Sequence, residues 1–161
     1  MTNKEIKIEY REYESAACLP AADKELADAA IQAIDSAYAP YSRFNVGAAV
    51  MFEDGEIIKG SNQENAAYPS GLCAERTALF YASASRPEKK MAAIAIAAAQ
   101  NGEICRNPVT PCGSCRQVMA QYQTKSGRPM KVILVGADKV WVFDKKHYIC
   151  GTCKDNSIDL L

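Results

Sequence analysis

Three cysteines and one glutamate stand at spacings that could build a catalytic metal site. Cys73 is followed two residues later by Glu75, and Cys112 and Cys115 form a Cys-x-x-Cys pair downstream. Three thiolates fill three of the four tetrahedral positions that zinc prefers and leave one for water, which is the layout of a catalytic site. Glu75 can reach that water without binding the metal, and its carboxylate can then take up and deliver protons.

The neighbouring residues predict how the charge of such a site is balanced. Three thiolates on Zn²⁺ sum to −1, which weakens the ability of the metal to acidify water. Arg76 and Arg116 are placed to offset that charge by hydrogen bonding to the sulfurs. Cys73 and Cys112 are each expected to open a helix, where the positive end of the dipole lowers a thiol pKa.

Simpler interpretations of these cysteines remain open. Cys112 and Cys115 alone could be a redox dithiol or half of a structural zinc site, as in a zinc-stabilised binding module that is no enzyme. A redox pair, however, needs neither the third thiol nor the acid. Cys150 and Cys153 could suggest a second zinc, but only His147 is near them, so we interpret them as free thiols.

Hydrophobic patterning and turn residues predict the elements that must position these side chains. Helices are expected over residues 23–38, 73–83 and 112–123. Strands are expected over residues 44–51, 57–60, 91–98, 131–135 and 140–143, and residues 6–10 alternate like a half-buried strand or a loosely attached arm. The sequence therefore predicts an α/β sheet with helices on its faces.

Two short connections predict how strands pair. Asp54-Gly55 lies between two strand candidates and is a strong hairpin signal. Residues 136–139 join the last two strands and are too few for a parallel crossover, so these strands should be antiparallel.

Composition limits the class of protein. A chain of 161 residues fits one domain, with a core at about residues 22–143, an N-terminal arm at 1–21 and an atypical tail at 144–161. Lys plus Arg equals Asp plus Glu at 19 each, without a basic stripe, which argues against a nucleic-acid partner.

The N-terminal residues, the apolar runs and the number of cysteines predict the cellular location of the protein. Residues 1–7 lack the apolar core of a secretory signal, and no apolar run approaches the roughly 20 residues that span a bilayer. Seven cysteines are an odd number for a disulfide framework. We therefore expect a cytoplasmic protein with no membrane partner.

Five stretches between residues 38 and 122 closely resemble the cytidine deaminases that act on free nucleosides. The matching stretches are YAPYS at 38–42, FNVGAA at 44–49, GSNQENAAY at 60–68, CAERT at 73–77 and PCGSCRQ at 111–117. The three-cysteine ligand set with a glutamate that does not bind the metal is also described for zinc deaminases.

The resemblance implies a fold and a reaction. The fold would be a three-layer α/β/α arrangement around a mixed five-stranded sheet, in a homotetramer with one Zn²⁺ per subunit. The reaction would be the hydrolytic deamination of cytidine and deoxycytidine to uridine and deoxyuridine with release of ammonia, in pyrimidine salvage. Glu75 would deprotonate the attacking water and protonate the ring nitrogen and the departing amine.

The resemblance also implies which residues bind the nucleoside. Asn62 and Glu64 match the pair that hydrogen-bonds the sugar hydroxyl, and Phe44 matches the aromatic residue that packs on the pyrimidine. Ala74 would present backbone groups to the base, and the carbonyl near Thr110 would receive the substrate amino group.

The chain departs from the family after Phe143. Family members typically continue with a Leu-Leu-Pro-Phe-like tail whose phenylalanine reaches an active site, and residues 144–161 contain no such tail. Related enzymes with the same fold act on blasticidin S or on cytosine in polynucleotides, and these remain alternative substrates. The balanced charge and the short connection at 136–139 disfavour the polynucleotide.

Overall fold

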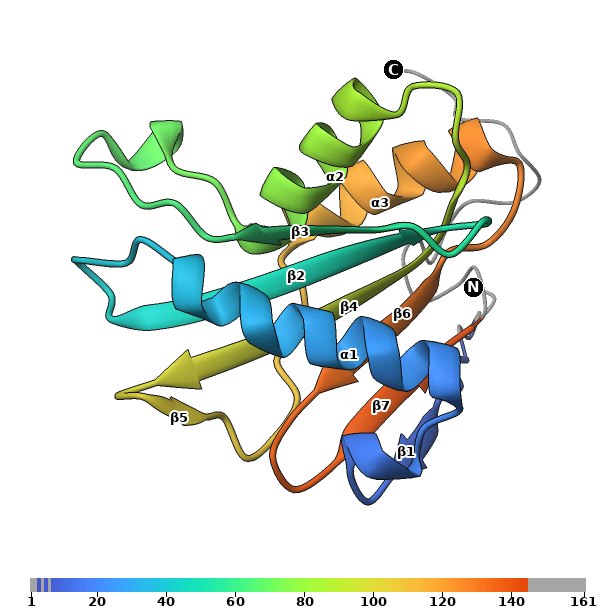
Figure 1. The fold of residues 1–161 in the computed structure, drawn as a ribbon, viewed down its shortest axis with the longest axis horizontal. Helices are drawn as coiled ribbons and strands as arrows, with labels where there is room; N and C mark the ends of the chain where they lie inside the picture. The colour runs from blue at the N-terminus through green and yellow to red at the C-terminus, as the bar shows by residue number, and fades with distance from the viewer. Residues whose placement is uncertain (1–2, 4, 6, 145–161) are drawn as a thin grey trace.

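A mixed β-sheet forms the centre of the molecule (Figure 1). The computed structural model describes residues 3, 5 and 7–144, so the tail that contains His147, Cys150 and Cys153 lies outside the described residues. The strands are β1 Arg11–Tyr13, β2 Phe44–Phe52, β3 Ile57–Ser61, β4 Met91–Gln100, β5 Glu103–Ile104, β6 Lys131–Val135 and β7 Val140–Phe143. Their order is β1-β7-β6-β4-β2-β3, with β5 paired to β4.

All five predicted strands are present, and the predicted pairings are confirmed. β2 and β3 form a hairpin, β6 and β7 are antiparallel, and only β4 and β6 run parallel among the described strands. Among the described residues the sheet has seven strands, and β1 and β5 are the two beyond the five that were predicted. β5 follows an Asn101-Gly102 turn in which both residues have positive φ, and this dipeptide is a hairpin signal that the sequence did contain.

Residues 6–10 were expected to be either a half-buried strand or a loosely attached arm. The strand is wrong for residues 7–10, because the strand in this region begins at Arg11 and pairs with β7, and residue 6 lies outside the described residues. Tyr10 instead packs its ring against Trp141 and Phe143, at centroid distances of 5.3 and 5.2 Å. Trp141 donates its indole N–H to Glu12 at 2.7 Å. These contacts to residues distant in sequence set the start of β1.

In the part of the chain that the structure describes, three helices cover the two faces of the sheet (Figure 1). They are α1 Ala21–Ala33, α2 Ala74–Ser85 and α3 Gly113–Ser126, with short 3₁₀ turns at Ala16–Cys18, Ile34–Ser36 and Tyr68–Ser70. Successive side chains of a strand point to opposite faces. In β4, Ile94 and Ile96 accordingly pack in the core under α2 and α3, whereas Ala93, Ala95 and Ala97 pack under α1. The three layers follow from this alternation.

The first helix is shorter than predicted. It ends at Ala33 and passes through the 3₁₀ turn to Ser36, whereas the pattern predicted a helix to residue 38. Tyr38 instead donates its backbone N–H to Asn62 and accepts from Glu64, so its backbone belongs to the loop after β3. In the part of the chain that the structure describes, no helix is long and apolar enough to cross a membrane.

Two glycines allow the helices to approach the sheet closely. A Cβ on Gly47 of β2 would lie 2.1 Å from the Ala30 carbonyl oxygen of α1. A Cβ on Gly60 of β3 would lie 2.5 Å from the Ala78 backbone nitrogen of α2. Backbone atoms at these distances cannot give way without a shift of the helix, so both glycines fix how deep the helices lie.

We predict that Gly47→Ala lowers the free energy of unfolding by about 1–3 kcal/mol or more, because the added methyl group overpacks the contact with α1. Urea unfolding measures the change.

Gly113→Ala is the matched control, because the same methyl group there meets no described atom within 4 Å. Equal stability of the Gly47→Ala variant and the wild type would contradict the close approach of α1 to β2.

Candidate functional site

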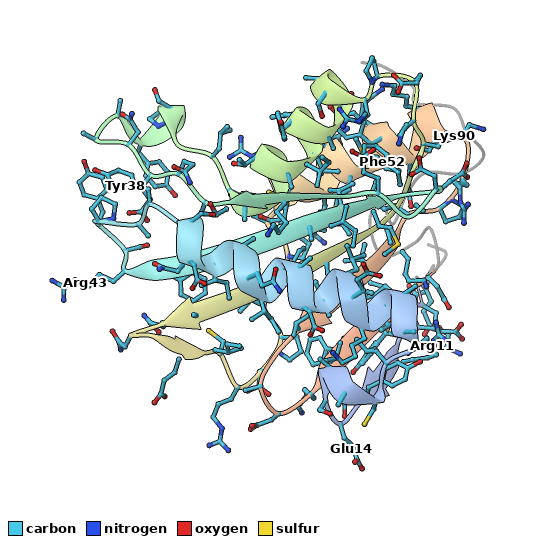
Figure 2. The ribbon with its side chains drawn as sticks, in the orientation of Figure 1. Arg11, Glu14, Tyr38, Arg43, Phe52 and Lys90 are labelled. Carbon is cyan, nitrogen blue, oxygen red and sulfur yellow. The ribbon has the colours of Figure 1, made fainter. Side chains whose placement is uncertain are left out.

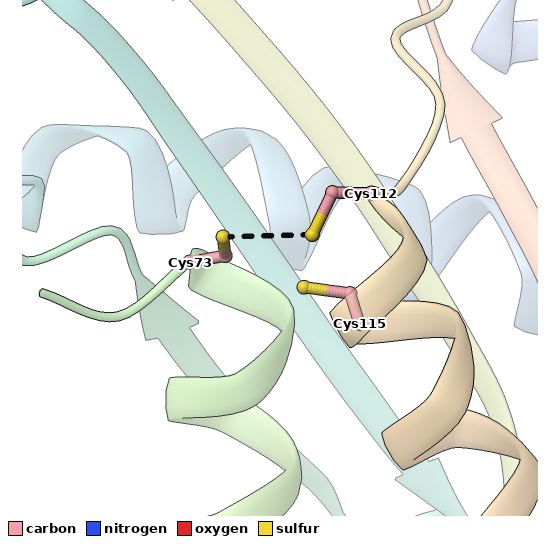
Figure 3. Close-up of side chains that lie close together, drawn as sticks. All are labelled: Cys73, Cys112 and Cys115. Atoms are coloured by element: carbon pink, nitrogen blue, oxygen red, sulfur yellow. Dashed lines mark hydrogen bonds between the residues drawn. The ribbon is translucent and has the colours of Figure 1, made fainter. Parts of the chain in front are cut away.

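The three predicted thiols come together where α2 and α3 begin (Figure 3). Cys73 immediately precedes α2, Cys112 immediately precedes α3, and Cys115 lies in the first turn of α3. The three sulfurs all lie within 4.8 Å of one another, and those of Cys73 and Cys112 are 4.0 Å apart. None of the three is in a disulfide.

This arrangement fits a zinc ion. A tetrahedral site with Zn–S bonds of about 2.3 Å separates its sulfurs by about 3.8 Å, close to the distance between Cys73 and Cys112. No described side chain caps the start of α2 or α3, so the positive ends of both helix dipoles are directed at the thiols. Both the donor set and its surroundings favour a cation that draws three thiolates together.

The thiols share charge unequally. The neighbouring Cys115 thiol has the largest effect on Cys73 and, with help from Arg76 and Cys112, lowers the pKa of the Cys73 thiol to about 5. Proximity to Cys73, together with burial, raises the pKa of Cys115. Cys73 is therefore the first of the pair to carry a thiolate, and Cys115 can follow when a cation compensates its charge.

Arg76 supplies a positive charge beside the sulfurs. Its Nη2 donates to the Cys73 sulfur at 3.7 Å, and this contact raises the pKa of Arg76. Its Nε is buried and finds no hydrogen-bond partner among the described residues. Arg116 is exposed, and within residues 7–144 no hydrogen bond joins its side chain to a sulfur.

Glu75 lies in the first turn of α2, directly after the fully buried Ala74. Only 5% of Glu75 is exposed, and this burial raises the pKa of its carboxyl, with a further contribution from the charge of Cys73. A carboxyl whose pKa is raised holds a proton more readily than an exposed one, which suits a group that takes up and delivers protons.

A cavity of about 840 Å³ opens over the thiols. It is lined by all the predicted substrate-binding residues and by two of the thiols, with Glu75 and Arg76: Phe44, Asn62, Glu64, Cys73, Ala74, Glu75, Arg76, Thr110 and Cys112. Cys115 lies behind them in the core and is fully buried. The predicted site residues span 71 positions of the sequence, from Phe44 to Cys115. The structure brings them together at this cavity.

The two polar residues of the predicted sugar site are held differently. Asn62 accepts a hydrogen bond from the Val46 N–H at 2.8 Å and donates to the Phe44 carbonyl at 2.9 Å. One donor hydrogen and one lone pair of its amide are then left for a ligand. Glu64 accepts from the backbone N–H groups of Tyr41 and Ser42 through one oxygen, Oε2, at 2.8 and 3.2 Å.

Ser42 and Gln63 are among the cavity-lining residues that were not predicted as site residues. Ser42 lines the cavity, and its hydroxyl accepts from the Phe44 N–H at 3.0 Å. Gln63 donates to the Ser36 carbonyl and to Ser61, and its backbone pairs with Leu72 beside Cys73. A serine two residues before a strand is a signal for such a turn, whereas the contacts of Gln63 depend on the tertiary fold.

Solved and curated proteins resemble this chain. A cytidine deaminase from Halalkalibacterium halodurans is 53% identical over 92 residues, and one from Sporosarcina psychrophila is 48% identical over 91 residues. These alignments cover 57% and 56% of this chain but 65% and 62% of those relatives, so the chain spans less than two thirds of their length.

The fold has a solved counterpart. The crystal structure of a cytidine deaminase from Burkholderia pseudomallei superposes with a TM-score of 0.66 and 38% identity, over 81% of this chain and 97% of that one. The family model for the cytidine and deoxycytidylate deaminase zinc-binding region matches residues 20–128, which include the three thiols and Glu75. The chain therefore belongs to the family of cytidine and deoxycytidylate deaminase zinc-binding proteins.

Proposed function

We propose that this protein deaminates cytidine and deoxycytidine hydrolytically, giving uridine or deoxyuridine and ammonia. One observation carries the proposal. Cys73, Cys112 and the buried carboxyl of Glu75 line a cavity of about 840 Å³, and the third thiol, that of Cys115, lies behind them in the core. The cavity has room for a nucleoside, because ligand pockets of this kind measure about 300–1,000 Å³.

The chain supplies the proton transfers. A zinc ion held by Cys73, Cys112 and Cys115 would act as a Lewis acid that lowers the pKa of water. Glu75 takes a proton from the water that attacks C4 of the pyrimidine and gives it to the ring nitrogen as the C4–O bond forms. It then takes the remaining proton from the new C4 hydroxyl and gives it to the amine, so that the C4–N bond breaks, the carbonyl forms and ammonia leaves. The hydrogen bond from Arg76 to Cys73 offsets the negative charge of the thiolates.

The other cavity residues orient the nucleoside. Phe44 packs on the pyrimidine ring, Ala74 presents backbone groups to the base, and the Thr110 carbonyl accepts from the substrate amino group. Asn62 and Glu64 bind the sugar hydroxyl with the capacity that their internal hydrogen bonds leave free. Their position in the lining of one cavity supports these roles.

The proposal also covers the oligomeric state of the protein, its metabolic role and its cellular location. We infer a single domain over residues 1–161 that forms a homotetramer and works in pyrimidine salvage in the cytoplasm. Exposed aromatic side chains near the cavity support association, since Tyr38, Tyr41 and Tyr68 are 58%, 63% and 92% exposed. Exposed apolar groups gathered in one region are typical of protein interfaces.

We predict that Glu75→Gln retains the zinc content of the wild type but lowers kcat for cytidine by about 10²–10⁴-fold, the usual contribution of general acid–base catalysis. Glutamine keeps the shape and removes the proton carrier. Metal analysis and steady-state kinetics on the same preparation measure both quantities.

Asp23→Asn is the matched control, because Asp23 is also a buried carboxylate but pairs with Lys131 at 2.7 Å in the layer of α1. It should keep its turnover. Turnover of the Glu75→Gln variant within a few-fold of wild type would refute the proton-transfer role.

Substrate choice gives a second prediction. With cytidine, deoxycytidine, blasticidin S and a short single-stranded DNA offered side by side, loss of cytosine absorbance should occur promptly with the two nucleosides, at rates of about 1–10³ s⁻¹. The acidic Glu64 at the cavity and the balanced net charge disfavour the polyanion. Prompt reaction on DNA with none on nucleosides would overturn the proposal, and zinc binding without any turnover would indicate a binding module.

A further inference from the structure

A chain of side-chain hydrogen bonds joins the loop after β3 to the end of α1. The Gln63 amide nitrogen donates to the Ser36 carbonyl at 3.2 Å and to the Ser61 hydroxyl at 3.1 Å. The Ser36 hydroxyl donates to the Ala33 carbonyl at 3.0 Å and lies 3.1 Å from the Ser61 hydroxyl. Because the single hydrogen of Ser36 goes to Ala33, Ser61 is the donor to Ser36. The donors therefore run in one direction, from Gln63 to the helix.

This network satisfies polar groups where α1 ends. The last carbonyls of a helix find no N–H within it, and Ala33 and Ser36 lie at the end of α1 and of the 3₁₀ turn that follows. Ser61 is only 3% exposed, so its hydroxyl is largely shut off from water and is paired within the protein. Gln63 uses both hydrogens of its amide, so removal of that amide takes a donor from both serines.

The backbone of Gln63 is the middle of three segments that pair like strands. It exchanges two hydrogen bonds with Leu72, N–H to carbonyl in each direction, both at 2.9 Å. On the other side, Glu64 donates to the Tyr38 carbonyl at 2.8 Å and Tyr38 donates to the Asn62 carbonyl at 2.9 Å. Figure 2 shows Tyr38 at the outer end of the molecule, where these loops come together. The side chain and the backbone of Gln63 thus fasten different parts of the chain to one point.

The position of Cys73 depends on the chain that enters it. Leu72 directly precedes Cys73, so its pair with Gln63 fixes the backbone where it reaches the thiol site. From the α2 side, the N–H and the hydroxyl of Thr77 donate to the Cys73 carbonyl at 3.0 and 3.2 Å. Residues 65–70, between the paired segments, are all exposed. Loss of the pair would therefore leave the Cys73 backbone held from the α2 side only.

We propose that Gln63 is a positioning residue for the metal site: its side-chain amide fastens the loop after β3 to the end of α1, and Leu72, paired with that loop, holds Cys73 in place. This inference rests on the zinc site of the proposed function. Zinc bound by three thiolates leaves only after a ligand moves away, so local opening of this loop should set how fast zinc is released.

The first test is the rate at which zinc-loaded protein releases zinc to an excess of a chromogenic chelator. Gln63→Ala should release zinc about 5- to 100-fold faster than the wild type, the effect of two lost neutral hydrogen bonds. Gln32→Ala is the matched control, because Gln32 lies in α1, is also exposed, and makes no side-chain hydrogen bond among the described residues. It should release zinc at the wild-type rate. Equal rates for Gln63→Ala and the wild type would overturn the inference.

Two further variants test the donor role and the route. Gln63→Glu keeps the shape but is an acceptor only at neutral pH, so it cannot donate to the Ser36 carbonyl and should release zinc at least as fast as Gln63→Ala. In a Ser61→Ala background, Gln63→Ala should accelerate release by a smaller factor, because one of the two bonds is already absent. Wild-type release from Gln63→Glu, or an equal factor in both backgrounds, would overturn the inference.

A destabilised variant separates positioning from a general loss of stability. Ser126→Ala removes a buried hydroxyl that accepts from the Met91 N–H at 3.1 Å, at the end of α3 remote from the thiols. Urea unfolding should show lower stability for this variant. Its zinc release, and the hydrogen exchange of the Gln63 and Leu72 amides, should stay at wild-type rates, whereas both accelerate in Gln63→Ala. Equal acceleration in both variants would overturn the inference.

The possible failures are distinguishable. Wild-type protein that binds no zinc removes the proposed function and this inference together. Zinc-loaded wild type with an unaffected Gln63→Ala variant removes the inference alone.

Discussion

The proximity of three sulfurs is the constraint on which the rest of the structure depends. Cys73, Cys112 and Cys115 lie within 4.8 Å of one another, and three thiolates so close repel each other strongly unless a cation lies between them. Three features of the chain reduce this repulsion. Two helices begin at the site, the guanidinium of Arg76 lies against Cys73, and the positions of the sulfurs suit a zinc ion.

The same constraint explains features that seem remote from the thiols. Both cysteine-bearing helices must lie on one face of the sheet, so the isoleucines of β4 face α2 and α3, and the alanines face α1. Gly60 sets the depth of α2 and hence the height of Cys73 and Glu75 above the sheet. On the side of the cavity away from the thiols, Asn62 and Ser42 fix the start of β2 by hydrogen bonds to its backbone.

Much of this could be predicted from the sequence, for identifiable physical reasons. The five long strands are apolar runs bounded by turn residues, and the two cysteine stretches carry their spacing in the sequence itself. Contacts between distant residues could not be predicted. β1 begins at Arg11 because Tyr10 packs on Trp141 and Phe143, and α1 ends early because Tyr38 pairs with Asn62 and Glu64. The polar site was predicted by residue type, but the hydrogen bonds of Asn62 to the backbone and the contacts of Gln63 required coordinates.

The central claim is that the metal has three sulfur ligands and one open position. X-ray absorption at the zinc edge of the purified protein tests it directly. The account predicts three sulfur scatterers at about 2.3 Å and one oxygen or nitrogen scatterer at about 2.0 Å. Four sulfurs would contradict it, because a closed site has no position for the water on which the proposed chemistry depends.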